Sequence, residues 1–228
     1  MRNRIYRLQY KYGQYAVTDL MKIIVIGQLA VFVLDFMLPI FNITSWMELT
    51  RAGLLHGQIW RLVTFLLVPP NTSPFFILFS LYFYYVLGTT LERTWGSFVF
   101  NVYYLIGWLG AVIAALVSGV GSNYYLNMSL FFAFAILYPN FEVSLFFVLP
   151  VKIKWIAIAD GVLFFLSFLS GSWSTRAAII ASLLNLVLFF GGDMLNRIKK
   201  EIGYAKTRRS FREQSARWNN NNNNRNGW

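Results

Sequence analysis

The sequence contains no cysteine and a single histidine among its 228 residues. Without cysteine the chain forms no disulfide, offers no thiolate nucleophile and provides no sulfur ligand for a metal. One histidine without a neighbouring group of carboxylates also falls short of the ligand set that zinc requires. We therefore expect no metal site and no cofactor.

Charged side chains are also scarce, at 13% of the residues, whereas 57% of the residues are hydrophobic and 19% are aromatic. A soluble domain carries about 25% charged residues, so this composition is typical of a membrane protein. A helix needs about 20 apolar residues to cross a bilayer. We interpret six apolar runs as transmembrane helices: 22–41, 75–91, 97–118, 124–138, 155–170 and 174–193. The first run is too long for a cleaved signal peptide and is expected to be retained.

The few charges predict an orientation. In a six-helix topology, seventeen of the 20 Lys and Arg residues lie on the side that both termini share. Since cytoplasmic loops carry an excess of Lys and Arg, we expect a multi-pass protein of the cell membrane with both termini in the cytoplasm. The formal net charge of +11 favours contact with anionic lipids of the bilayer, and no nucleic-acid partner is expected.

These patterns divide the chain into three regions. Residues 1–21 form a basic interfacial arm, 22–193 an all-α membrane domain of six helices, and 194–228 a basic tail. The tail includes six consecutive asparagines and is expected to be partly disordered in the cytoplasm, apart from a helical extension over 194–212. The aromatic, proline-containing segment 42–74 is expected to fold back into the outer leaflet.

Two of the six runs have unusual features. The third carries a stripe of small residues, one every four positions, which predicts a close helix–helix contact: Gly107, Ala111, Ala115 and Gly119. The fourth, at 124–138, is too short to cross a bilayer alone. We expect neighbouring helices to surround it.

Three groups of residues form motifs in a specific order and spacing. The first is Gly57-Gln58-Ile59-Trp60-Arg61-Leu62-Val63-Thr64, and the second contains Gly88, Leu91, Glu92, Gly96, Ser97, Phe98, Tyr104 and Gly107. The third is Tyr138-Pro139-Asn140 followed by Leu149 to Trp155. Together they resemble motifs of the rhomboid family of intramembrane serine proteases. The resemblance covers about 53–192 and implies a rhomboid-like bundle of six transmembrane helices.

The catalytic residues that this resemblance implies are not found. A rhomboid serine lies in a glycine-x-serine-glycine step, but no glycine flanks Ser129, the candidate nucleophile. The run that corresponds to the family's histidine is Ala181-Ser182-Leu183-Leu184-Asn185, which contains no base. The family's histidine and asparagine of the second helix fall on Phe76 and Ser80. His56, the one histidine, is expected to face solvent in the outer loop.

Three acidic residues lie in or beside the apolar runs. Asp35 and Asp160 are charges inside predicted helices, where a carboxylate is costly, and neither has an obvious partner in the sequence. For Asp160, a structural pairing with Lys152 or Lys154, or a water-filled lateral cleft, would each explain the charge. We expect Glu92 to cap the amides that begin the third helix, near Ser97.

The resemblance and the missing residues lead to one functional hypothesis and two alternatives. The resemblance to inactive rhomboids and their derlin relatives implies a non-catalytic protein that binds transmembrane segments of client proteins in quality control or trafficking. The alternatives are a serine protease that uses Ser129 with an unusual base, and a small transporter or channel. In the family a client enters between the second and fifth helices, where the candidate gate residues are Phe76, Phe79, Phe83, Phe164 and Phe168.

Overall fold

The computed structural model describes residues 9–70, 73–145, 149–173 and 175–190. The chain forms two compact units, Met1–Phe189 and Phe190–Trp228, and the fold described here is that of the first. The beginning of the expected arm and the whole expected tail at 194–228, with its asparagine run, lie outside the described residues.

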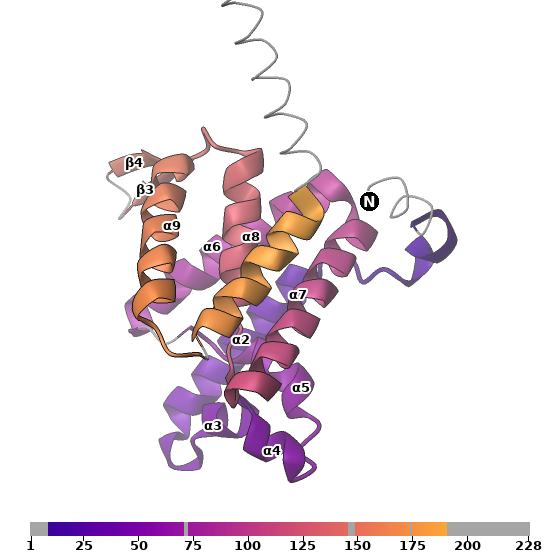
Figure 1. The fold of residues 1–228 in the computed structure, drawn as a ribbon, viewed down its shortest axis with the longest axis vertical. Coiled ribbons are helices and arrows are strands. Elements are labelled where there is room, and N and C mark those ends of the chain that lie inside the picture. Colours follow the sequence, from indigo (N-terminus) through magenta and orange to yellow (C-terminus); the bar gives the residue numbers. More distant parts are fainter. Residues whose placement is uncertain (1–8, 71–72, 146–148, 174, 191–228) are drawn as a thin grey trace, which may run out of the picture. The chain divides into compact units, whose positions relative to one another are not determined.

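The first unit consists mostly of helices (Figure 1). Its long helices are α2 (Leu20–Met37), α6 (Pro74–Trp95), α7 (Ser97–Ser118), α8 (Tyr124–Leu137), α9 (Ile153–Ser170) and an unlabelled helix, Thr175–Phe190. The shorter elements are η1 (Gly13–Tyr15), η2 (Pro39–Phe41), α3 (Ile43–Met47), β1 (Leu49–Thr50), α4 (Arg51–Leu55), α5 (Arg61–Thr64), η3 (Phe65–Leu67), β2 (Val120–Gly121), β3 (Glu142–Leu145) and β4 (Leu149–Lys152).

Each of the six predicted apolar runs contains a helix within the residues that the structure describes. Among these residues, three helices are long and apolar enough to cross a membrane: Gln9–Met37, Ser97–Ser118 and Ile153–Ser170. The helices Tyr124–Leu137 and Thr175–Phe190 are apolar but shorter. The chain thus has the helices of a membrane protein, while six crossings and the side of each terminus stay predictions.

A single glycine joins α6 to α7. Gly96 has φ 85° and ψ 151°, a conformation that is essentially restricted to glycine, and its N–H donates to the carbonyl of Glu92 at 2.8 Å. A residue with a Cβ would be strained at this corner. A glycine is therefore required at position 96 by the conformation of the backbone.

The short helix α8 is the most enclosed of the long helices. It contacts α6, α7 and α9, and nine of its 14 residues are buried. By contrast, only two of the 18 residues of α9 are buried, and α9 lies beside α8 and β4 (Figure 1). The expectation that neighbouring helices surround the fourth run is confirmed.

The described part of the segment 42–74 packs on α7 through β1 and α4, and on α2 through α3 and η3. Its strand β1 pairs with β2 in antiparallel register, Leu49 opposite Gly121. Leu49 and Phe65 pack with Ala115 of α7 in a buried cluster, and the Trp108 indole N–H donates to the carbonyl of Leu62 at 2.6 Å. Burial of these apolar side chains explains why this segment is not a simple linker.

Arg61 holds the turns of this segment together. Its side chain is 9% exposed and donates to Oε1 of Gln58 and to the backbone carbonyls of Ser45 and Glu48, at 2.5, 3.0 and 2.5 Å. A guanidinium presents several donors in a fixed plane, which suits a group of converging oxygens. Gly53 packs so closely that an added Cβ would lie 2.7 Å from Nε of Arg61.

The expected role of Glu92 needs correction. Glu92 does not cap α7, whose first turn has no side-chain cap; instead Oε1 of Glu92 accepts a hydrogen bond from the backbone N–H of Asp19 at 2.9 Å. Glu92 thereby ties the start of α2 to the end of α6.

After α8, the strand β3 pairs with β4 in antiparallel register, with Glu142 opposite Lys152.

Candidate functional site

The candidate nucleophile Ser129 lies on α8 and is 1% exposed. Its hydroxyl makes a close hydrogen bond with the Tyr103 hydroxyl of α7, and Nδ2 of Asn185 donates to the same oxygen at 3.3 Å. The Tyr103 hydroxyl also donates to the backbone carbonyl of Ser129 at 3.0 Å. Three helices therefore meet at one buried polar cluster, Tyr103–Ser129–Asn185.

The partners of the Ser129 hydroxyl are another hydroxyl and an amide. In the bond between the Tyr103 and Ser129 hydroxyl groups either oxygen can be the donor, and the Tyr103 hydroxyl also lies within hydrogen-bond distance of the carbonyl of Ser129. The Ser129 oxygen also accepts from the amide of Asn185. Neither tyrosine nor asparagine is a base near neutral pH. The cluster satisfies the serine hydroxyl without activating it.

A small cavity adjoins Ser129 and Asn185. Its volume is about 20 Å³, and its walls come from α7, α8 and helix Thr175–Phe190, including Gly107, Ala111 and Ala181. Such a space holds about one water molecule. A Cβ at Gly107 would lie 2.9 Å from Nδ2 of Asn185, so the glycine creates the space that the amide occupies.

The expected close helix–helix contact is present at Gly107, which faces Leu126 of α8 and Asn185. Ala115 instead packs with Leu49 of β1 and Phe65 of η3. Gly119 has another role, because it ends α7 with φ 97° and an added Cβ there would meet nothing within 4 Å.

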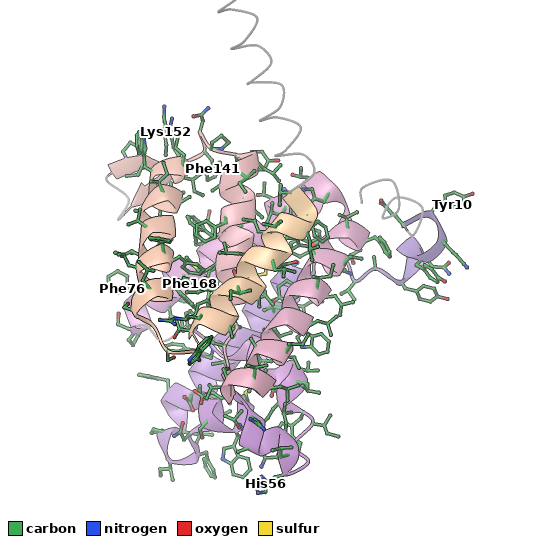
Figure 2. The ribbon with its side chains drawn as sticks, in the orientation of Figure 1. Tyr10, His56, Phe76, Phe141, Lys152 and Phe168 are labelled. Atoms are coloured by element: carbon green, nitrogen blue, oxygen red, sulfur yellow. The ribbon has the colours of Figure 1, made fainter. Side chains whose placement is uncertain are left out.

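His56 lies far from the cluster. It ends α4, and its Nδ1 lies 2.7 Å from the carbonyl of Ala52, on the exposed end of the segment 42–74 (Figure 2). Among the described residues, the contacts of Ser129 include no histidine, lysine or carboxylate. The described residues also contain no group of three potential metal ligands of the His, Cys, Asp and Glu types.

Asp35 has a structural partner that the sequence did not reveal. Its Oδ1 accepts from the backbone N–H of Ile43 at 2.7 Å, and its Oδ2 accepts from the Thr44 hydroxyl at 2.7 Å. The carboxylate caps the start of α3, where free amides and the helix dipole favour negative charge. This explains an acidic residue near the end of an apolar helix.

The candidate gate residues lie on both sides of α8. Phe79 and Phe83 of α6 stack with centroids 6.3 Å apart, and Phe83 lies 5.9 Å from Phe131 of α8. On the other side, Phe164 of α9 lies 5.4 Å from the neighbouring Phe132. An aromatic series thus connects α6 to α9 across α8.

The outer gate residues are Phe76 and Phe168. Phe76 is 44% exposed at the start of α6, and Phe168 lies towards the end of α9 (Figure 2). The carbonyl of Phe168 accepts from Nε of Arg176 at 3.0 Å. The role of these residues as a gate stays a prediction.

Asp160 is half-buried on the inner face of α9. It is one turn from the buried Phe164, and its charge acts on Tyr84 of α6 and Tyr124 of α8. Among the described residues its carboxylate makes no hydrogen bond or ion pair, so the pairing with Lys152 or Lys154, one of the two explanations for this charge, is not present.

Sequence reasoning missed Tyr103 and the role of Asn185. Asn185 was considered only as a failed base, although a buried amide is a strong donor. One signal was available: Ser182 and Asn185 are three positions apart and hence on one face of an apolar helix. In the structure Ser182 donates to the carbonyl of Tyr125 at 2.8 Å, beside the cluster.

The residues that carry the rhomboid resemblance have structural roles. Trp60 is half-exposed before α5, Arg61 organises the outer segment, and Gly96 with Ser97 forms the corner between α6 and α7. A comparison of the sequence with models of known protein families found no match. A comparison with curated proteins found none either.

Proposed function

We propose that this chain is a rhomboid-like membrane protein that cuts no peptide bond and instead binds transmembrane segments of other proteins, in their quality control or trafficking. It is an integral, multi-pass protein of the cell membrane with both termini in the cytoplasm. The client segment contacts α9 and the space between α9 and α6.

The state of Ser129 supports the non-catalytic half of the proposal. Its hydroxyl is engaged by Tyr103 and Asn185, neither of which accepts a proton near neutral pH. The adjoining cavity of about 20 Å³ has room for one water but not for a peptide group and its side chains. Acyl transfer needs a base and oxyanion donors around a substrate carbonyl.

The observation that carries the binding half is the exposed surface of α9. Of the three candidate spans it is the least enclosed, with 11% of its most apolar 18 residues buried against 33% in α7. Seven large apolar side chains of α9 have exposed fractions between 52% and 61%: Trp155, Ile158, Val162, Leu163, Phe165, Leu166 and Leu169. Five of them, all except Leu163 and Leu166, recur every three or four positions and form a stripe, which suits packing against another helix.

The inner face of α9 supplies a polar contact for the same client. Apolar packing alone discriminates poorly between a protein helix and lipid, because lipid tails are as apolar as leucine. Asp160 makes no hydrogen bond or ion pair among the described residues, and a carboxylate within an apolar helix is costly. A client that brings a Lys, Arg or amide donor to Asp160 lowers that cost.

Site-specific photo-crosslinking tests the binding half. Crosslinkers placed at Phe79 and Phe168 are expected to capture transmembrane segments of other proteins. The matched control is Ile113, which is 61% exposed on α7 and samples chance encounters in the bilayer. A crosslinker near Gly107 should capture only neighbours within the chain. Equal capture at Ile113 and Phe168, or capture at neither, would contradict the proposal.

A serine-directed fluorophosphonate tests the non-catalytic half. The purified full-length protein is expected to remain unlabelled, because no base raises the nucleophilicity of Ser129. Labelling that disappears in Ser129→Ala would support the protease alternative instead.

A further inference from the structure

An elongated apolar groove of about 450 Å³ runs along the face of α7 that lies beside the N-terminal arm. This volume is within the range of ligand-binding sites, about 300–1,000 Å³. The arm contributes Tyr12, Tyr15 and Val17 to one wall, and Val63 and Leu66 of the outer segment contribute to another. The groove is separate from the cluster at Ser129, whose cavity shares no lining residue with it.

The floor of the groove has the length of one membrane leaflet. Residues of α7 line it from Phe98 through Leu105 to Trp108, at spacings that place them on one helical face. Ten residue steps at 1.5 Å correspond to about 15 Å. The hydrocarbon layer of one leaflet is also about 15 Å, half of roughly 30 Å. An acyl chain aligned with α7 therefore fits the groove.

A cation lies beside the arm's end of the groove. Nζ of Lys11 is 5.3 Å from the ring centroid of Tyr12, which lines the groove, and Lys11 is exposed. Between residues 9 and 22 the charged side chains are Lys11, Asp19 and Lys22, so this stretch is basic overall. Juxtamembrane Lys and Arg attract anionic headgroups.

We propose that this groove binds one anionic glycerophospholipid from the leaflet that the N-terminal arm contacts. One acyl chain lies along Leu105 and Trp108, and the phosphate lies near Lys11. Phosphatidylglycerol provides both the chain and a headgroup with a net negative charge. The lipid fills the space between arm and helix and fastens the arm to α7.

Native mass spectrometry of the full-length protein tests this proposal, with dioleoyl phosphatidylglycerol or dioleoyl phosphatidylcholine added to the detergent solution. Leu105→Trp fills the groove, and Val63→Trp fills it from the opposite wall. The matched control is Leu109→Trp, since Leu109 is 45% exposed on the same helix, Leu105 is 53% exposed, and Leu109 does not line the groove. Circular dichroism compares the fold of all three variants with that of the wild type.

We expect the wild type and Leu109→Trp to retain one phosphatidylglycerol, and the two groove variants to lose it by about tenfold or more. Lys11→Ala should reduce the preference for phosphatidylglycerol over phosphatidylcholine. Retention in both groove variants, or equal loss in Leu109→Trp, would overturn the site. Equal binding of both lipids by the wild type would contradict the preference for an anionic headgroup. If filling the groove instead abolishes a dimer, its occupant is a second copy of the chain and the proposal is wrong.

Discussion

Replacing Arg61 with alanine is expected to unfold the outer segment 42–74 before the helical core. The guanidinium is the common donor for Oε1 of Gln58 and for the carbonyls of Ser45 and Glu48. The Ser45 and Glu48 carbonyls belong to the end of α3 and Gln58 to the turn before α5, so the one donor joins two parts of the segment. Alanine would leave all three oxygens without it, in a site where Arg61 itself is 9% exposed.

The size of the effect follows from these contacts. A hydrogen bond to a charged group contributes about 1.5–3 kcal/mol, although bonds that share one donor are not additive. We therefore expect a loss of about 3–4 kcal/mol for Arg61→Ala. A loss of 1 kcal/mol lowers the melting temperature by roughly 2–4 °C in a chain of this size, so the shift should be about 6–16 °C. Arg61→Lys keeps the charge but not the planar group of donors, so its melting temperature should lie between those of the wild type and Arg61→Ala.

Thermal unfolding in detergent, followed by tryptophan fluorescence, measures this loss. The matched control is Arg51→Ala in the same segment, because the Arg51 side chain is exposed and its contact with Gly119 is through the backbone. Arg51→Ala should change the melting temperature by less than about 2 °C, since surface substitutions are usually within 0.5 kcal/mol. Equal shifts in the two variants would refute the assignment of Arg61 as the organising donor.

Three further substitutions test other parts of the structure. Gly107→Ala places a Cβ 2.9 Å from the Asn185 amide and should lower the free energy of unfolding by about 1–3 kcal/mol in a chemical or thermal melt. The control Gly161→Ala, whose added Cβ meets nothing within 4 Å, should not lower it. Asp35→Ala removes the cap of α3 and should cost about 1–2 kcal/mol by the same melt, and no change would contradict the capping role. Asp160→Asn should reduce crosslinking of client segments that contain lysine more than that of purely apolar ones, and equal reduction would contradict the polar contact.

The positions of the long helices were predictable because apolar runs and their boundaries are local properties of the sequence. The run 97–118 coincides with α7, and the run 124–138 differs by one residue from α8. Gly96 could likewise be recognised as a corner between two runs. By contrast, the pairing of β3 with β4 was not predicted, since each strand is only four residues long and the second contains a proline.

Contacts between distant residues could not be predicted in the same way. Glu92 was assigned to the nearest free amides, those of α7, but it accepts from Asp19, 73 positions earlier in the sequence. Reasoning from the sequence assigns a carboxylate to the donors nearest along the chain. In the folded protein it can accept from any donor that packing brings near it. Asp35 shows the same limit with a smaller separation, because its partners lie eight and nine residues beyond it.

The buried cluster at Ser129 shows how a membrane environment constrains such contacts. No water in the bilayer core replaces a missing partner, so polar residues in apolar helices must bind one another. By that rule the polar residues of these helices are candidate hydrogen-bond partners of one another: Tyr103, Ser129, Ser182 and Asn185. Which of them form hydrogen bonds depends on how the three helices pack. One atom of the set, Oδ1 of Asn185, still lacks a donor, and the cavity beside it has a volume of about 20 Å³. A single water there would complete the network and leave no room for a substrate carbonyl at Ser129.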